Sequence, residues 1–172
     1  PIYFIIIAAC VGVTVGGTSL IANSIGENNK DKVLGFFAQT LLYGVFVSII
    51  ITSIGLIFAP NLFALMGSDD LVLSLSLEYT NVVFSGSIAF IIFVALNSLL
   101  QADGDTVTYK NILILNFFLN IVLNPLFIFG YGFIPSLGVA GIGYATILVN
   151  ILGVFLILLK VLKSKRIIGL SI

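Results

Sequence analysis

Long stretches without a charged residue are the feature that most constrains how this chain can fold. Residues 1–26 and residues 111–159 contain no Asp, Glu, Lys or Arg. Only 8% of the 172 residues are charged and 60% are hydrophobic, whereas a soluble domain carries about 25% charged residues. Polar surface is too scarce for a water-soluble particle, so the composition predicts an integral membrane protein.

The apolar stretches divide into five segments, each long enough for a transmembrane helix of about 20 residues. The run 111–159 is too long for one crossing, and the Gly- and Pro-containing stretch GYGFIPSLG (130–138) divides it. The alternating pattern of a membrane β-barrel is absent. We therefore predict an all-α, polytopic membrane helix bundle. The expected spans are 2–25, 33–58, 76–99, 108–129 and 138–162.

The segment NLFALMG (61–67) follows the second expected span. It fits a short interfacial helix or an ordinary extracellular loop, and the sequence favours neither.

Basic residues fall on one side if the five helices alternate in direction. The opposite connections carry only Asp69, Asp70 and Glu78. Because basic loops stay in the cytoplasm, we expect a multi-pass protein of the cell membrane, with the start of this stretch outside and its end cytoplasmic. The seven basic residues are Lys30, Lys32, Lys110, Lys160, Lys163, Lys165 and Arg166.

Three asparagines, Asn116, Asn120 and Asn124, recur at a spacing of four in the apolar segment NFFLNIVLNPLFIFGYG. This spacing places them on one helix face, and exposing that face to lipid would cost several kcal/mol per unpaired amide. The amides either bond across helices as structural contacts or line a polar cavity that holds a cation or substrate. Thr146 and Asn150 repeat the spacing in the fifth span.

Pro125 follows Asn124 directly. Its ring lacks an amide hydrogen and clashes with the carbonyl of Ile121, so a helix kink is expected near this level. The freed carbonyl is either a ligand for a coupling ion, as at transporter helix breaks, or a consequence of packing alone.

The sequence lacks the residues that several classes of function require. The chain has no His and one Cys, Cys10, which excludes an internal disulfide and most zinc sites. The net charge is zero, so no basic patch indicates nucleic acid. No ionisable side chain lies deep in an expected span, although a proton relay needs one. We therefore predict neither an enzyme nor a metal or cofactor site.

Several motifs resemble the multidrug and toxic compound extrusion (MATE) transporters. NIVLNPLFIFGYG followed by LGVAGIGYAT is similar to the fifth and sixth helices of that family. GGTSLIANSIGENNKDKV is similar to its second helix and the loop that follows, and LEYTNVVFSG with ALNSLLQADGDTVTYKNILILN to its fourth helix and cytoplasmic exit. The order and spacing agree over essentially the whole chain.

The resemblance implies a twelve-helix transporter with two six-helix lobes, which exchanges Na⁺ or H⁺ for organic cations or drugs by alternating access. Residues 1–172 would then be a partial N-terminal lobe, helices two to six, with the first helix and the C-terminal lobe missing. Asn120 matches a family Asn and Thr146 a family Thr. Asn124 stands where relatives often have Asp, and Asn150 where they often have Gln.

Two other interpretations remain open. A relative in the same wider superfamily could flip lipid-linked oligosaccharides or other amphiphiles, for which basic residues inside the cavity are expected. The chain could also be a non-transporting membrane fragment. It begins with Pro1 and not with Met, and we expect it to be a piece of a longer protein that is inactive alone, because a partial lobe cannot form an alternating-access path.

Overall fold

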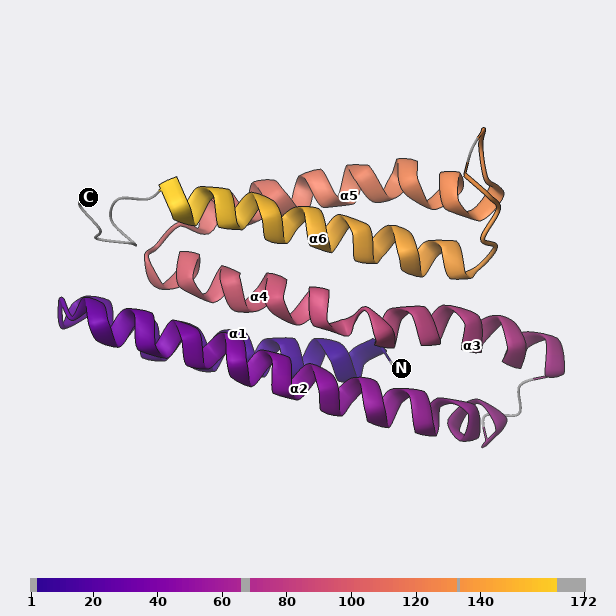
Figure 1. Cartoon of the computed structure of the whole chain (residues 1–172), viewed down its shortest axis with the longest axis horizontal. Coiled ribbons are helices and arrows are strands. Elements are labelled where there is room, and N and C mark those ends of the chain that lie inside the picture. Colours follow the sequence, from indigo (N-terminus) through magenta and orange to yellow (C-terminus); the bar gives the residue numbers. More distant parts are fainter. Residues whose placement is uncertain (1–2, 66–68, 133, 164–172) are drawn as a thin grey trace.

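The structure, a computed structural model, describes residues 3–65, 69–132 and 134–163. These residues form six helices and no strand (Figure 1). The prediction of an all-α membrane helix bundle is confirmed. The helices are α1 (Tyr3–Gly26), α2 (Lys30–Leu65), α3 (Asp70–Ser85), α4 (Ser87–Ala102), α5 (Thr106–Phe129) and α6 (Ala140–Lys163).

By length and composition, the described helices provide four membrane-spanning units, or five if the bent pair α3–α4 forms one span. Four segments of the described chain are individually long and apolar enough to cross a bilayer: 6–26 within α1, and the whole of α2, α5 and α6. The fifth unit is the pair α3 and α4, which passes the same test only when its two helices are taken together. The ends of α1, α5 and α6 lie within two residues of the ends expected from the sequence.

The third span differs from the single helix expected over 76–99, because it is broken at Gly86. The axes of α3 and α4 meet there at 43°. The side chain of Ile147 in α6 occupies the space into which a Cβ at Gly86 would project. Only glycine leaves room for this close packing of α6 against the break.

The second span is also longer than expected. The helix α2 continues past 58 and through Pro60 to Leu65, so residues 61–65 prolong α2 and form neither a separate interfacial helix nor a loop. Proline removes one backbone hydrogen bond and bends a helix without having to end it. Residues 66 and 67 of the expected segment lie outside the described residues.

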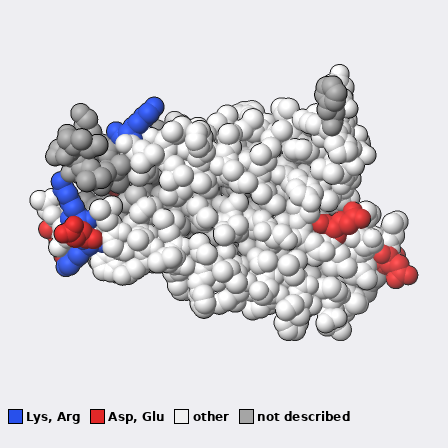
Figure 2. All heavy atoms as spheres, in the orientation of Figure 1, with Lys and Arg blue, Asp and Glu red and all other residues white. Residues whose placement is uncertain are grey.

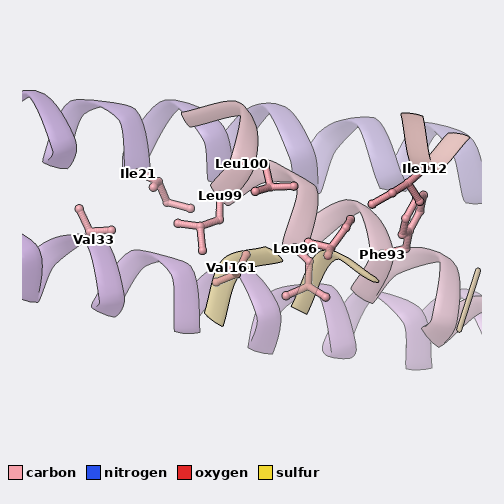
Figure 3. Close-up of a cluster of buried hydrophobic side chains, with 9 residues drawn as sticks. Ile21, Val33, Phe93, Leu96, Leu99, Leu100, Ile112 and Val161 are labelled. Atoms are coloured by element: carbon pink, nitrogen blue, oxygen red, sulfur yellow. The ribbon is translucent and has the colours of Figure 1, made fainter. Parts of the chain in front are cut away.

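The helix α4 lies at the centre of the bundle, with α1 and α2 on one side and α5 and α6 on the other (Figure 1). Its side chains Leu96, Leu99 and Leu100 are almost completely buried. They meet Ile21 of α1 and Ile112 of α5 in one apolar cluster (Figure 3). This cluster joins the two sides of the bundle through α4.

The connection between α5 and α6 fixes how these two helices meet. Gly130 ends α5 with a positive φ of 73°, and the amide of Leu137 donates a 2.9 Å hydrogen bond to the carbonyl of Phe127. A Cβ at Gly141 would lie 2.7 Å from that same carbonyl oxygen. Glycine therefore lets the first turn of α6 rest directly on the backbone of α5.

Charged side chains gather at the two ends of the bundle, and the face shown in Figure 2 has no charged side chain in its middle. One end, here called the basic end, holds the α1–α2 and α4–α5 turns and the end of α6, with Lys30, Lys32 and Lys160 (Figures 1 and 2). The other end holds Asp69 and Asp70. Lys165 and Arg166 lie outside the described residues.

Candidate functional site

A cavity of about 560 Å³ opens between α1, α4, α5 and α6. Its walls combine aliphatic and aromatic side chains with a set of uncharged polar ones. None of the described residues that line it is Asp, Glu, Lys or Arg. The polar lining consists of Cys10, Thr14, Asn97, Gln101, Tyr109, Asn116, Asn120, Thr146 and Asn150.

Four of the five polar residues singled out in the sequence meet in this cavity. Asn116 and Asn120 enter from α5, and Thr146 and Asn150 from α6. Their spacing of four puts each pair on one helix face, and the packing of α5 against α6 brings the two faces together. The structure does not place Asn124 in the lining.

The amide nitrogens of this group bond within their own helices. Asn120 Nδ2 donates to the carbonyl of Asn116 at 3.1 Å, and Asn150 Nδ2 donates to the carbonyl of Thr146 at 2.8 Å. The hydroxyl of Thr146 likewise donates to the carbonyl of Ile142 at 2.8 Å. Each of these bonds stays within one helix. They are therefore not the interhelical hydrogen bonds that would hold two membrane helices together.

Several amide oxygens of the cavity residues, in contrast, have no hydrogen-bond partner in the part of the chain that the structure describes. Oδ1 of Asn97, Asn116 and Asn120 is buried and has no hydrogen-bond partner among the described residues. A buried acceptor without a partner costs about 1–3 kcal/mol, and each such atom in a native structure calls for an explanation, such as strain, a bound ion or an ordered water. All three residues line one cavity, while the oxygen atoms themselves are buried. The residues that line the cavity therefore hold unpaired neutral oxygens, the kind of atom that accepts hydrogen-bond donors or coordinates a cation.

Asn124 and Pro125 lie farther along α5, towards the end of the bundle opposite the basic end. Oδ1 of Asn124 is also buried without a partner among the described residues, but it does not border the cavity. The helix α5 continues through Pro125 to Phe129.

Asn97 and Gln101 of α4 belong to the cavity but were not among the predicted site residues. Asn97 is only 1% exposed. Asn97 and Gln101 are four residues apart. Cys10 and Thr14 of α1, which also line the cavity, have the same spacing. The same spacing that indicated the α5 stripe could have identified both pairs. What the sequence lacked was the placement of α4 and α1 beside α5.

Aromatic rings form much of the remaining wall. Phe93 of α4 and Tyr109 of α5 stack with ring centroids 5.4 Å apart and a tilt of 36°, and Phe90 and Phe117 lie in the same lining. The negative face of an aromatic ring attracts a cation and also packs against a flat apolar molecule. The wall thus suits ligands that combine an aromatic body with a positive charge or a donor.

The MatE family model matches residues 1–126. The chain belongs to the MatE family. This confirms the resemblance found in the sequence motifs. Because relatives of the chain include transporters, membership supports a general role in transport.

Curated relatives are named as multidrug resistance proteins or, in one case, as a transporter. The chain is 28% identical over 166 residues to the "Probable multidrug resistance protein YoeA" of Bacillus subtilis, covering 96% of this chain and 36% of that protein. It is 29% identical over 147 residues to the "FAD transporter" of Shewanella oneidensis, covering 86% of this chain and 32% of that protein. The chain therefore spans about a third of the length of these relatives.

Solved structures of MATE transporters share the fold. One described as an "Inward-facing conformation of a multidrug resistance MATE family transporter of the MOP superfamily" superposes with a TM-score of 0.84 at 30% identity, covering 93% of this chain and 36% of that one. Its outward-facing counterpart gives 0.81 at 29% identity, covering 95% and 36%. The five-span unit thus keeps one fold in both conformations of those transporters.

Proposed function

We propose that this chain forms most of the N-terminal lobe of a cation-coupled antiporter that exports organic cations or drugs by alternating access. In this proposal the remaining helices of the transporter lie beyond residues 1–172, and the stretch alone is inactive. Support comes from family membership, from the multidrug-resistance names of relatives, and from the coverage of only 36% of such a relative.

The observation that carries the proposal is that Asn97, Asn116 and Asn120 all line the cavity and that each holds a buried oxygen without a partner among the described residues. Amide oxygens are hard ligands of the kind that Na⁺ accepts at transporter sites. Together with the rings of Phe93 and Tyr109, they form a neutral site that binds a cation without a carboxylate ligand.

The coupling ion is Na⁺ or H⁺, and the neutral cavity favours Na⁺ within this lobe. A proton-coupled mechanism requires an ionisable group, which the rest of the transporter would have to supply. We place the protein in the cell membrane with its basic end in the cytoplasm, because basic connections remain on that side.

A phosphate-bearing substrate, such as a lipid-linked oligosaccharide or a flavin nucleotide, would need cationic partners. The lining of this cavity contains no Lys or Arg among the described residues. The cavity therefore favours cationic or uncharged drugs over anionic substrates.

The test is ethidium export by the complete transporter in proteoliposomes, with Na⁺ and H⁺ gradients applied separately. Asn120→Leu removes one ligand oxygen at nearly constant volume, and a contact worth about 1.4 kcal/mol changes affinity about ten-fold. We expect ethidium export to fall at least about ten-fold, while the amount of protein in the membrane stays normal. The matched control is Asn81→Leu, an exposed amide of α3 outside the cavity. Unchanged export by Asn120→Leu would contradict the proposal.

A further inference from the structure

Gly153 of α6 lies behind the cavity wall and does not line it. It is buried and follows Thr146, Val149 and Asn150 along the same helix face, one turn nearer the basic end. At this position the face is covered by Phe93 of α4 and Asn116 of α5, both of which do line the cavity. Three helices therefore converge on a residue without a side chain.

The packing leaves no room for even one methyl group at Gly153. A Cβ there would lie 2.6 Å from Cε2 and 3.0 Å from Cδ2 of the Phe93 ring, and 3.1 Å from Nδ2 of Asn116. Carbon atoms in good contact are about 3.5–4.0 Å apart, so the ring would have to move by a substantial part of an ångström. The amide of Asn116 would have to move as well.

Phe93 cannot move back into the core. It belongs to the apolar cluster that includes Leu96 and Ile112 (Figure 3), and it stacks on Tyr109. Such clusters are packed at crystal density and have almost no free volume, whereas the cavity in front of the ring is open space. A side chain at Gly153 would therefore push Phe93 and Asn116 into the cavity.

We propose that Gly153 determines the size of substrate that the cavity accepts, because it lets Phe93 and Asn116 withdraw towards α6. This inference rests on the proposed transport function, and it assigns a specificity role to a residue that touches no substrate. The glycine thus sets the depth of the cavity where Phe93 and Asn116 both line it.

The first experiment compares Gly153→Ala with wild type in the complete transporter, using a bulky planar cation, ethidium, and a small one, tetraethylammonium. One additional methylene group in an apolar pocket changes the preference between two substrates by about ten-fold or more. We expect the KM for ethidium to rise about ten-fold while the KM for tetraethylammonium and both kcat values stay near wild type. Gly35→Ala is the matched control, because a Cβ at Gly35 of α2 meets nothing within 4 Å.

The second experiment does not depend on transport. Cys10, the single cysteine of this stretch, lines the cavity, and its alkylation can be followed by mass spectrometry of its peptide. Gly153→Ala should slow modification by a fluorescein maleimide and leave modification by a methyl thiosulfonate unchanged. If wild type transports neither cation, the proposed function fails, and this labelling still decides the role of Gly153.

A double variant distinguishes the proposed contact between Gly153 and Phe93 from a general folding defect. Phe93→Leu removes the ring atoms that a Cβ at Gly153 would strike, so its bulky-reagent labelling should be fastest. Gly153→Ala alone should be slowest, and Phe93→Leu with Gly153→Ala should label nearly as fast as Phe93→Leu, because the added methyl group no longer meets the ring. A double variant that labels as slowly as Gly153→Ala would overturn the inference. So would an equal loss of both substrates or both reagents in Gly153→Ala, which indicates a general structural effect.

Discussion

The hydroxyl of Thr52 in α2 donates a 2.7 Å hydrogen bond to the carbonyl oxygen of Phe84, two residues before the break at Gly86. The same Oγ lies 2.8 Å from the Oγ of Ser87 on the far side of the break. Thr52 thus contacts both halves of the broken span. Backbone groups released by a helix break inside a membrane need such partners, since no water is available there.

Thr52→Val should destabilise the protein, because it keeps the shape of the side chain and removes the hydroxyl. Interhelical hydrogen bonds in membranes contribute about 0.6–2 kcal/mol, so we expect a loss in that range in SDS- or heat-induced unfolding of the purified protein. The control is Ser53→Ala. Its exposed hydroxyl donates only to the carbonyl of Ile49 in the same helix. Equal stability of the two variants would show that the contact at the break contributes nothing.

The break also shows where sequence reasoning ends. The charge-free intervals indicated five spans, because lipid imposes length and composition on each segment separately. Gly86, by contrast, is one of 17 glycines, and what distinguishes it is that Ile147 of α6 packs against the break there. That contact joins residues far apart in the chain and leaves no local pattern.

The residues of the site likewise divide into those that the sequence predicts and those that only the packing of the helices reveals. Asn116 and Asn120 were visible as a stripe on one helix. Asn97 and Gln101 repeat the same spacing on α4, and they become part of the site because α4 lies at the centre of the bundle. The expected position of Asn124 in the cavity assumed that the whole stripe faces it, but the structure does not include this residue in the lining.

Asn97→Leu should separate function from stability. The side chain is 1% exposed and its oxygen has no partner among the described residues, so an apolar side chain of similar volume removes a desolvation cost of about 1–3 kcal/mol. We expect the stability to stay equal or rise, while ethidium export falls. A loss of stability above about 1 kcal/mol would instead show that this amide is satisfied in the folded protein.

Asp105 predicts a pH dependence at the basic end of the bundle. Its carboxylate caps α5 by accepting hydrogen bonds from Thr108 Oγ1 at 2.6 Å and from the Thr108 amide at 2.9 Å, and Lys160 of α6 lies 3.6 Å away. These donors, and to a smaller extent Lys160, hold the pKa of Asp105 below its ordinary value of 3.8. The unfolded chain therefore binds this proton more readily than the folded protein.

The stabilising contribution of Asp105 is thus fully present above its ordinary pKa and is lost as the pH falls through the lowered value. Asp105→Asn keeps a residue suited to cap a helix but cannot titrate. Thermal unfolding in detergent from pH 7 down to about pH 3 should show a smaller acid-induced loss in Asp105→Asn than in wild type. Parallel curves for the two proteins would mean that Asp105 does not contribute to acid sensitivity.

Cys10 offers a direct report on occupancy of the cavity. Its side chain lines the α1 wall opposite α4 and α5, and a ligand held by the amide oxygens and the aromatic rings would cover it. We expect ethidium to slow alkylation of Cys10 in proportion to the fraction of cavities occupied, with half-protection near the KM for export. Asn120→Leu should shift that midpoint about ten-fold upwards if it removes one ligand contact of about 1.4 kcal/mol, whereas Asn81→Leu should leave it unchanged. Protection that persists unaltered in Asn120→Leu would place the ligand elsewhere, because occupancy of this cavity must depend on the oxygens that border it.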